Sequence, residues 1–250
     1  MRIAVAGATG RIGRMTVEAL TRDGHEAVAI SRATGVDLTT GDGLEASLRD
    51  VEVVVDASNT TARDEQSIVE FFSAATGNLL AAEHAAGVGH HVLLSIVGID
   101  HRQKVPHYAG KRAQERLVAD GPVPWSIVRA TQFHDFAAMS AEWAERDGVA
   151  TVAPLLVQPV AFEDVAAALA DVATGAPLRA RIDVAGPDTH DLVDMARRTF
   201  AARGRDIRLV PTWQGIFDTT MAGEVLLPGP DARLGRITFD DWLAAGAPSS

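Results

Sequence analysis

Short apolar runs alternate with longer amphipathic segments along the first half of the chain. The apolar runs predict β-strands at residues 2–6, 27–30, 51–55, 92–94 and 125–128. The segments between them have apolar residues at helical spacing and predict helices at 12–23, 44–48, 64–86 and 107–119. Because the predicted strands are apolar almost throughout, helices are expected on both faces of their sheet. The pattern therefore predicts a doubly wound parallel α/β sheet, with a ligand crevice at the carboxyl ends of the strands.

The pattern becomes less regular after about residue 135. Shorter segments predict helices at 136–146, 162–173 and 192–203 and strands at 182–184 and 207–210. The tail, 247–250, is expected to be frayed. We predict that residues 1–150 form the domain that carries the sheet. Residues 151–250 are expected to form a small C-terminal substrate lobe packed on the same domain, with a soft boundary.

The composition is that of a folded, acidic protein. Hydrophobic residues make up 47% of the 250 residues, which is enough for a core and excludes a disordered chain. The formal net charge of -10 argues against nucleic acid or an anionic membrane as a partner. Cysteine is absent, which excludes disulfides, thiolate metal sites and cysteine nucleophiles. Neither a secretory signal pattern nor a membrane-spanning run is evident, so a cytoplasmic protein is expected.

A glycine-rich turn joins the first predicted strand to the first predicted helix. Gly7, Gly10 and Gly13 form a G-x-x-G-x-x-G motif. Glycine permits a tight turn and lets a pyrophosphate approach the backbone, and the N–H groups at the helix start bind phosphate oxygens. Some turns of this kind bind nothing, but the place between a strand and a helix is the context that dinucleotide binding requires. Residues 1–150 are therefore predicted to be a dinucleotide-binding Rossmann domain.

The end of the second predicted strand indicates which dinucleotide is bound. NAD-binding domains usually carry Asp or Glu there, whereas this chain has Ser31 and Arg32. A carboxylate repels a 2′-phosphate, and a guanidinium group binds one through two hydrogen bonds. The sequence therefore predicts that NADP(H) is preferred over NAD(H), with Arg11 as a second candidate phosphate contact. The alternative is that Arg32 is an ordinary solvated arginine.

Five groups of residues occur in an order that resembles a known family. They are Gly7–Gly13, Ser31-Arg32, Leu94–Gly98, His107–Lys111 with Ala113-Gln114-Glu115, and Val128–Phe133. Together they resemble the atypical short-chain dehydrogenase/reductase proteins, in the branch with NmrA-like and NAD(P)H-binding quinone-reductase-like members. The matches span about residues 1–170. That branch contains both reductases and non-catalytic nucleotide sensors, so the resemblance does not specify a substrate.

The resemblance implies a role for each matching position. It implies these cofactor contacts: Gly7, Ala8, Thr9, Gly10, Arg11, Ile12 and Gly13 at the pyrophosphate; Ser31 and Arg32 at the 2′-phosphate; Asp37 and Leu38 at the adenine; Ala57 and Ser58 at the adenosine ribose; and Ala130, Thr131, Gln132 and Phe133 at the nicotinamide. It also implies that Ser95, at the end of the central strand, contacts the cofactor, and that Lys111 binds the nicotinamide ribose and takes part in catalysis.

The catalytic pattern of the family is Tyr-x-x-x-Lys, and this chain departs from it. His107 occupies the tyrosine position, and Tyr108 lies only three residues before Lys111. Residues three and four apart share a helix face, so both side chains are candidates for the catalytic acid. Lys111 is one of two lysines in an arginine-rich chain, which favours a task for a compact ammonium group. A third possibility is that neither side chain acts and that water or the substrate supplies the proton.

The remaining candidates carry weaker signals. His90 and His91 begin a strand and point to opposite faces, so they cannot chelate one metal together, and no metal site is predicted. His134 follows a strand and is either a general acid or a packed histidine. Five apolar residues lie in an irregular segment and either wall a pocket for a flat apolar substrate or form the core of the lobe: Trp213, Phe217, Met221, Leu226 and Leu227.

These observations predict an NADPH-dependent oxidoreductase that transfers a hydride to a carbonyl, quinone or enone of a small apolar molecule. The alternative is a non-catalytic, NmrA-like regulator that senses NADP(H) and binds a protein partner. A sugar-nucleotide epimerase is disfavoured because the C-terminal part is short for holding a second nucleotide. The sequence leaves the oligomeric state open.

Overall fold

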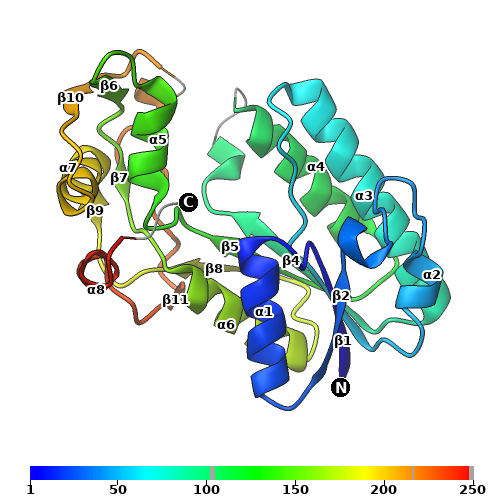
Figure 1. Cartoon of the computed structure of the whole chain (residues 1–250). Helices are drawn as coiled ribbons and strands as arrows, with labels where there is room; N and C mark the ends of the chain where they lie inside the picture. Colours follow the sequence, from blue (N-terminus) through cyan, green and yellow to red (C-terminus); the bar gives the residue numbers. More distant parts are fainter. Residues whose placement is uncertain (102–104, 216, 248–250) are drawn as a thin grey trace. The chain divides into compact units, whose positions relative to one another are not determined.

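A computed structural model describes residues 1–101, 105–215 and 217–247 of the chain (Figure 1). The chain divides into two compact units. Unit 1 consists of Met1–Arg129 and Val165–Ile182, and unit 2 consists of Ala130–Asp164 and the segment that begins at Asp183. The chain therefore leaves unit 1, returns to it and leaves it again.

The central sheet lies mostly in unit 1, and most of its strands are predicted apolar runs. Its strands are β1 (Arg2–Ala6), β2 (Glu26–Ile30), β3 (Val53–Asp56), β4 (His90–Ile96), β5 (Trp125–Ala130) and β8 (Arg181–Ala185). The end of β8 pairs in parallel with β11 (Arg233–Leu234), and the sheet order is β11-β8-β5-β4-β3-β1-β2. Strand β1 pairs in parallel with both β2 and β3. The predicted doubly wound parallel sheet is confirmed, and its winding direction reverses between β1 and β3, where a ligand crevice is expected.

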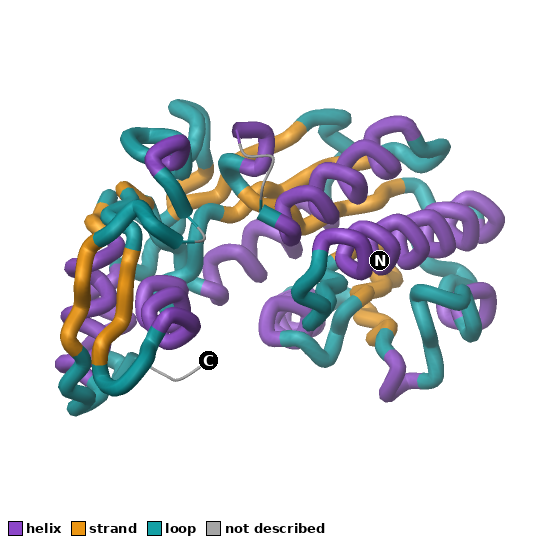
Figure 2. Tube along the Cα trace, turned by 90° about the horizontal axis from the view of Figure 1, so that it is seen from above, coloured by secondary structure: helices purple, strands orange, loops and turns teal. Residues whose placement is uncertain are grey.

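Helices lie on both faces of this sheet (Figure 2). They are α1 (Arg11–Arg22), α2 (Leu44–Ser47), α3 (Glu65–Ala86), α4 (Pro106–Asp120) and α6 (Phe162–Thr174), with the 3-10 helices η1 (Arg32–Thr34) and η2 (Ile99–His101). The longest helix, α3, begins where the Asp64 carboxylate accepts a hydrogen bond from the Ser67 N–H at 2.8 Å. Such a cap stabilises a helix by about 1 kcal/mol. The helix ends where Gly87 adopts a φ of +74°, a conformation that favours glycine.

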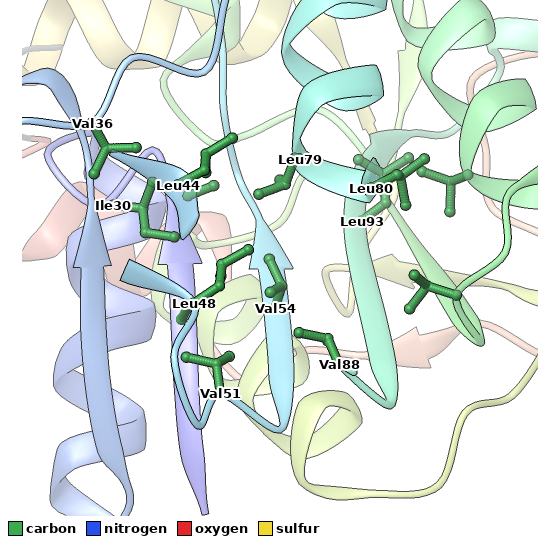
Figure 3. Close-up of a cluster of buried hydrophobic side chains, with 14 of the residues drawn as sticks. Ile30, Val36, Leu44, Leu48, Val51, Val54, Leu79, Leu80, Val88 and Leu93 are labelled. Carbon is green, nitrogen blue, oxygen red and sulfur yellow. The ribbon is translucent and has the colours of Figure 1, made fainter. Parts of the chain in front are cut away.

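An apolar core of unit 1 joins the sheet to α2, α3 and α4 (Figure 3). Its strand members come from alternate positions, as Ala4 and Ala6 of β1 illustrate. Ile3 and Val5 point to the opposite face and are also fully buried. Because both faces of the strand are covered, its sequence is an uninterrupted apolar run rather than an alternation of apolar and polar residues.

Unit 2 is built from shorter elements. Its helices include α5 (Phe136–Ala144), α7 (Leu192–Ala202) and α8 (Phe239–Ala244), with the 3-10 helix η3 (Thr219–Met221). Strand β6 (Val149–Val152) pairs in parallel with β10 (Arg208–Pro211), and β7 (Leu156–Val157) pairs antiparallel with β9 (His190–Asp191). The sequence predicted α5, α7 and β10. It did not predict β6, β7, β9, β11 or α8, which have two to six residues and lie where apolar runs and amphipathic segments no longer alternate regularly.

The two units are not separated at a single point of the chain. Most of α6 and the first residues of β8 belong to unit 1, although they come after the first segment of unit 2. Of the tail expected to be frayed, Ala247 is buried, with 1% exposure, and residues 248–250 lie outside the described part. In the described part of the chain, no helix combines the length and the hydropathy that crossing a membrane requires.

Candidate cofactor site

The glycine turn after β1 has no room for a side chain at two positions. Gly7 has a φ of +76°, and a Cβ atom there would lie 2.6 Å from the carbonyl oxygen of Ala57. A Cβ atom at Gly13 would lie 2.2 Å from the carbonyl oxygen of Gly7. Both distances are far shorter than van der Waals contact, and both blocking atoms belong to the backbone. The two glycines therefore let the start of α1 lie directly against the ends of β1 and β3.

The N-terminus of α1 is open to an anion. Its N-cap is Gly10, and no side chain of the described residues caps it. The first helical hydrogen bond runs from the Arg14 N–H to the Gly10 carbonyl oxygen at 2.9 Å. The amides of a first helical turn have no acceptor within their own helix, and the helix dipole makes this end positive. Beside the turn, Ser58 is 4% exposed, and its hydroxyl has no partner among the described residues. These features fit the pyrophosphate of a dinucleotide.

Arg32 lies at the end of β2 and is exposed. The turn that carries it is held by a reciprocal cap, in which the Ser31 N–H donates to Thr34 Oγ1 at 3.0 Å. Hydrogen bonds from Thr39, with the charge of Arg32, hold the pKa of the Asp37 carboxyl below its usual value. The strand end thus combines an arginine in solvent with an ionised aspartate that is already hydrogen-bonded to its own loop.

Lys111 lies on α4, and its amino group is enclosed by unit 1. The residue is 5% exposed, and Nζ donates to the carbonyl oxygen of Leu94 at 2.9 Å and to Oε1 of Gln114 at 2.7 Å. Nζ also lies 4.6 Å from the centre of the Phe72 ring, a distance typical of a cation–π contact. Burial lowers the pKa of Lys111 to about 8, although the charge of Asp56 opposes this shift.

His107 and Tyr108 lie one turn before Lys111 on the same helix. Tyr108 is buried, with 7% exposure, and His107 packs edge-on against Phe72 with ring centres 5.6 Å apart. Burial, together with the charge of Lys111, lowers the pKa of His107 to about 4. The imidazole is therefore neutral at neutral pH, where it is a weaker proton donor than an imidazolium ion. This favours Tyr108 over His107 as the candidate acid.

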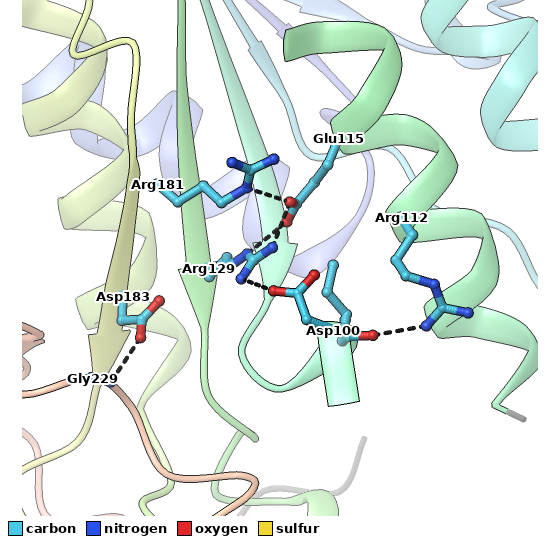
Figure 4. Close-up of polar contacts among 8 residues, drawn as sticks. Asp100, Arg112, Glu115, Arg129, Arg181, Asp183 and Gly229 are labelled. Carbon is cyan, nitrogen blue, oxygen red and sulfur yellow. Dashed lines mark hydrogen bonds and ion pairs between the residues drawn. The ribbon is translucent and has the colours of Figure 1, made fainter. Parts of the chain in front are cut away.

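An ion network around the buried Glu115 carboxylate of α4 was not predicted from the sequence (Figure 4). Glu115 is 3% exposed and accepts two hydrogen bonds from Arg129, at 2.8 and 2.7 Å, and one from Arg181 at 2.8 Å. Arg129 also donates to Asp100, in the segment after β4, at 2.7 Å. Burial raises the pKa of Glu115, but the hydrogen bonds from Arg129 and Arg181 outweigh it and lower this pKa. Ser95, expected at the end of the central strand, is the second-last residue of β4 and lies near this network.

The residues expected at the nicotinamide, Ala130–Phe133, belong to unit 2. The Thr131 hydroxyl donates to a backbone carbonyl oxygen at 2.6 Å, and Phe133 stacks on Phe162 with ring centres 4.1 Å apart. Gln132 is 7% exposed, and neither polar atom of its side chain has a partner among the described residues. A buried amide without hydrogen-bond partners destabilises the folded protein, and a polar ligand bound at this segment would supply such partners.

Unit 2 contains a cavity of about 190 Å³. Its lining residues come from α5, β6, α7 and the segment after β10, and they include Phe217, one of the residues predicted to wall a pocket. Trp213 and Leu227 are not among its lining residues, and Met221 and Leu226 are buried core residues. The described residues that line the cavity include no charged side chain. A cavity of about 150 Å³ is large enough to bind benzene.

The other candidate histidines have structural partners. His90 Nε2 lies 2.8 Å from the Ser126 hydroxyl, and His91 Nδ1 lies 2.8 Å from the Glu83 carboxylate. The two histidines thus have separate partners, as their opposite directions on β4 predict. His134 is 1% exposed and packs against two aromatic rings of α8, which supports its interpretation as a packed residue.

The comparisons with known proteins agree with this geometry. Residues 7–175 match the model of a family described as NAD(P)H-binding. The chain is 28% identical over 226 residues to (4-alkanoyl-5-oxo-2,5-dihydrofuran-3-yl)methyl phosphate reductase of Streptomyces griseus, covering 82% of this chain and 75% of the reductase. It is also 26% identical to photosystem II assembly factor Ycf39 of Synechocystis sp., over 147 residues that make up 53% of this chain. The chain spans 45% of the length of that relative.

Solved structures share the fold at low sequence identity. A short-chain dehydrogenase/reductase superfamily protein from Agrobacterium tumefaciens with bound NAD has a TM-score of 0.71 and 18% identity, over 99% of this chain and 96% of the other. The NADPH-dependent quinone oxidoreductase of Escherichia coli, complexed with NADPH, has a TM-score of 0.68 and 20% identity, over 84% and 78%. The shared fold is consistent with the resemblance to atypical short-chain dehydrogenase/reductase proteins. Since the matched segment covers more than half of the chain, this protein belongs to the NAD(P)H-binding family.

Proposed function

We propose that this protein is an NADPH-dependent oxidoreductase that reduces a carbonyl, quinone or enone of a small apolar molecule. The observation that carries the proposal is the glycine turn, in which Gly7 and Gly13 bring the uncapped start of α1 against the strand ends. When bound there, NADPH supplies a hydride to the substrate, and an acid supplies the proton that completes the reduction.

Residues of this chain then have separate tasks. The amides at the start of α1 bind the pyrophosphate, and Arg32 binds the 2′-phosphate. Lys111 binds the nicotinamide ribose. Tyr108 donates the proton, and the Lys111 ammonium group stabilises the phenolate that remains.

The substrate class is supported by two observations. The cavity of unit 2 is lined by aromatic and small neutral side chains, which suits a neutral molecule with one or two rings. In addition, the relative from Streptomyces griseus is named a reductase and covers most of this chain.

Arg32→Ala is expected to weaken NADPH binding by about 10- to 100-fold, because the variant loses a charge-assisted hydrogen-bonded pair with the 2′-phosphate. NADH lacks the 2′-phosphate, so its affinity is expected to stay unchanged. Titration of both nucleotides against wild type and variant measures this. Arg22→Ala removes another exposed arginine of unit 1 and serves as the control. Equal wild-type affinities for NADH and NADPH, both unaffected by Arg32→Ala, would contradict the assignment.

Tyr108→Phe is expected to lower turnover by about 100-fold or more, as loss of a general acid does, with little effect on NADPH affinity. His107→Ala is expected to change turnover far less, because its imidazole is already neutral. Steady-state kinetics and NADPH titration of both variants separate the two effects. The reverse order of effects would move the acid to His107, and full turnover in both variants would rule out a side-chain acid at this helix.

The experiment that tests the function is NADPH oxidation, followed by its absorbance, across a panel of quinones, aldehydes and enones. Reduction of at least one class is expected. Tight NADPH binding without turnover across the panel would instead support the NADP(H)-sensing regulator.

A further inference from the structure

We propose that Gln114 is a positioning residue, whose side-chain amide links the Lys111 ammonium group to the Asp56 carboxylate and fixes the place of the ammonium group. The inference rests on the proposed function, in which Lys111 binds the cofactor. It concerns a residue that touches neither cofactor nor substrate in that proposal and acts through Lys111.

The link consists of three buried side chains from two elements. Gln114 and Asp56 have no exposed surface, and Lys111 is 5% exposed. Gln114 Oε1 accepts from Lys111 Nζ at 2.7 Å, and Gln114 Nε2 donates to Asp56 Oδ2 at 2.8 Å. The bridge therefore connects α4 to the end of β3.

The chemistry of the groups allows only one orientation of the amide. An ammonium group can only donate hydrogen bonds, and a carboxylate can only accept them. The amide carbonyl must therefore face Lys111, and the amide N–H must face Asp56. Burial makes a lost partner costly at both ends, so this arrangement has few alternatives.

Asp56 also reaches the phosphate turn. Its second oxygen, Oδ1, accepts from the Ser58 N–H at 2.9 Å. That nitrogen is one of the atoms against which Gly7 packs, since a Cβ atom at Gly7 would lie 2.9 Å from it. One carboxylate thus holds the backbone beside the proposed pyrophosphate site and, through Gln114, the lysine of the proposed ribose site.

The groups that face Lys111 make its charge sensitive to this bridge. Asp56 on β3 and Glu115 on α4 favour the ammonium form, whereas burial beneath the Phe72 ring of α3 opposes it. His107 of α4 is neutral at neutral pH and adds no charge. The pKa of Lys111 is about 8. The part of the NADPH affinity that depends on the ammonium group is therefore fully present below that pH, and it is lost as the pH rises through the pKa.

The test follows Lys111 directly. The chain has two lysines, so nuclear magnetic resonance of protein with isotope-labelled lysine gives two side-chain signals, which Lys104→Arg assigns. In wild type, Lys111 is expected to titrate near pH 8. Gln114→Met keeps the length of the side chain without the amide, and it is expected to lower that titration by about one pH unit. The pH at which NADPH affinity falls is expected to move down by the same amount.

Two further variants separate positioning from general stability. Gln66→Met removes an exposed glutamine of α3 and is expected to change neither readout. In Gln114→Glu, the carboxylate that replaces the amide lies beside the Lys111 ammonium group, so it is expected to raise the Lys111 titration above that of wild type, opposite to the effect of Gln114→Met. This variant also carries the test if Gln114→Met does not fold.

The outcomes for the two proposals are distinguishable. If Gln114→Met lowers the melting temperature but Lys111 titrates as in wild type, Gln114 is merely structural and the inference is overturned. If wild type does not bind NADPH at any pH, the proposed function fails, whatever the Lys111 titration shows.

Discussion

Gly13→Ala is expected to weaken NADPH binding by roughly 100-fold or more, which corresponds to the loss of two charge-assisted hydrogen bonds to the phosphates. The new methyl group would lie 2.2 Å from the carbonyl oxygen of Gly7, so α1 must shift away from β1. That shift carries the amides at the helix start away from the phosphates that they are proposed to bind. The same overpacking is expected to lower the free energy of unfolding by about 1–3 kcal/mol.

Isothermal titration with NADPH and urea unfolding measure the two effects separately. Gly77→Ala is the matched control, because a Cβ atom at this position of α3 would meet nothing within 4 Å. Alanine there is expected to stabilise the protein by about 0.5–1 kcal/mol and to leave NADPH binding unchanged. Wild-type affinity in a folded Gly13→Ala protein would show that this turn does not hold the pyrophosphate.

Arg129→Met is expected to lower the free energy of unfolding by about 1.5–3 kcal/mol, because the buried Glu115 carboxylate loses its two hydrogen bonds from Arg129. Glu115 would keep only Arg181 among its arginine partners, and it is 3% exposed. The segment after β4 would also lose the contact between Arg129 and Asp100.

Chemical unfolding followed by circular dichroism checks this value. Arg197→Met removes an arginine that is paired with Asp194 on the surface of α7, and it is expected to cost less than about 1 kcal/mol. Adding Glu115→Gln to Arg129→Met is expected to recover part of the loss, because the buried Glu115 charge, left with Arg181 as its only arginine partner, is then removed. Equal effects of Arg129→Met and Arg197→Met would contradict a special role for the buried network.

The sheet of unit 1 was predictable because its elements are long enough to show a period and have clear end signals. The helix α3 illustrates this, since Asp64 and Gly87 mark its two ends in the sequence and cap it in the structure. Unit 2 was less predictable. Its strand β7 has two residues, and its pairing with β9 depends on a contact between segments more than 30 residues apart, which no local pattern encodes.

For the candidate site, the sequence identified groups that act through the backbone or through a motif. Gly7 and Gly13 are examples, because a strand, a glycine turn and a helix follow each other directly in the chain. It did not identify Asp56 and Gln114 as partners, which are 58 positions apart and meet only once the sheet has formed. The sequence also could not predict the low pKa of His107. A position on a helix does not reveal the burial that lowers this pKa to about 4.

The division of the chain into units has a consequence for biosynthesis. Strand β5 lies between β4 and β8, but β8 is made only after the 35 residues of Ala130–Asp164, which belong to unit 2, and after α6. Until β8 has also emerged from the ribosome, β5 is the edge strand of the sheet that β1 to β5 can form, and such an edge is prone to pair with other chains. Pairing with β8 covers this edge, so the nascent chain is expected to need protection from aggregation in the interval between the emergence of the two strands.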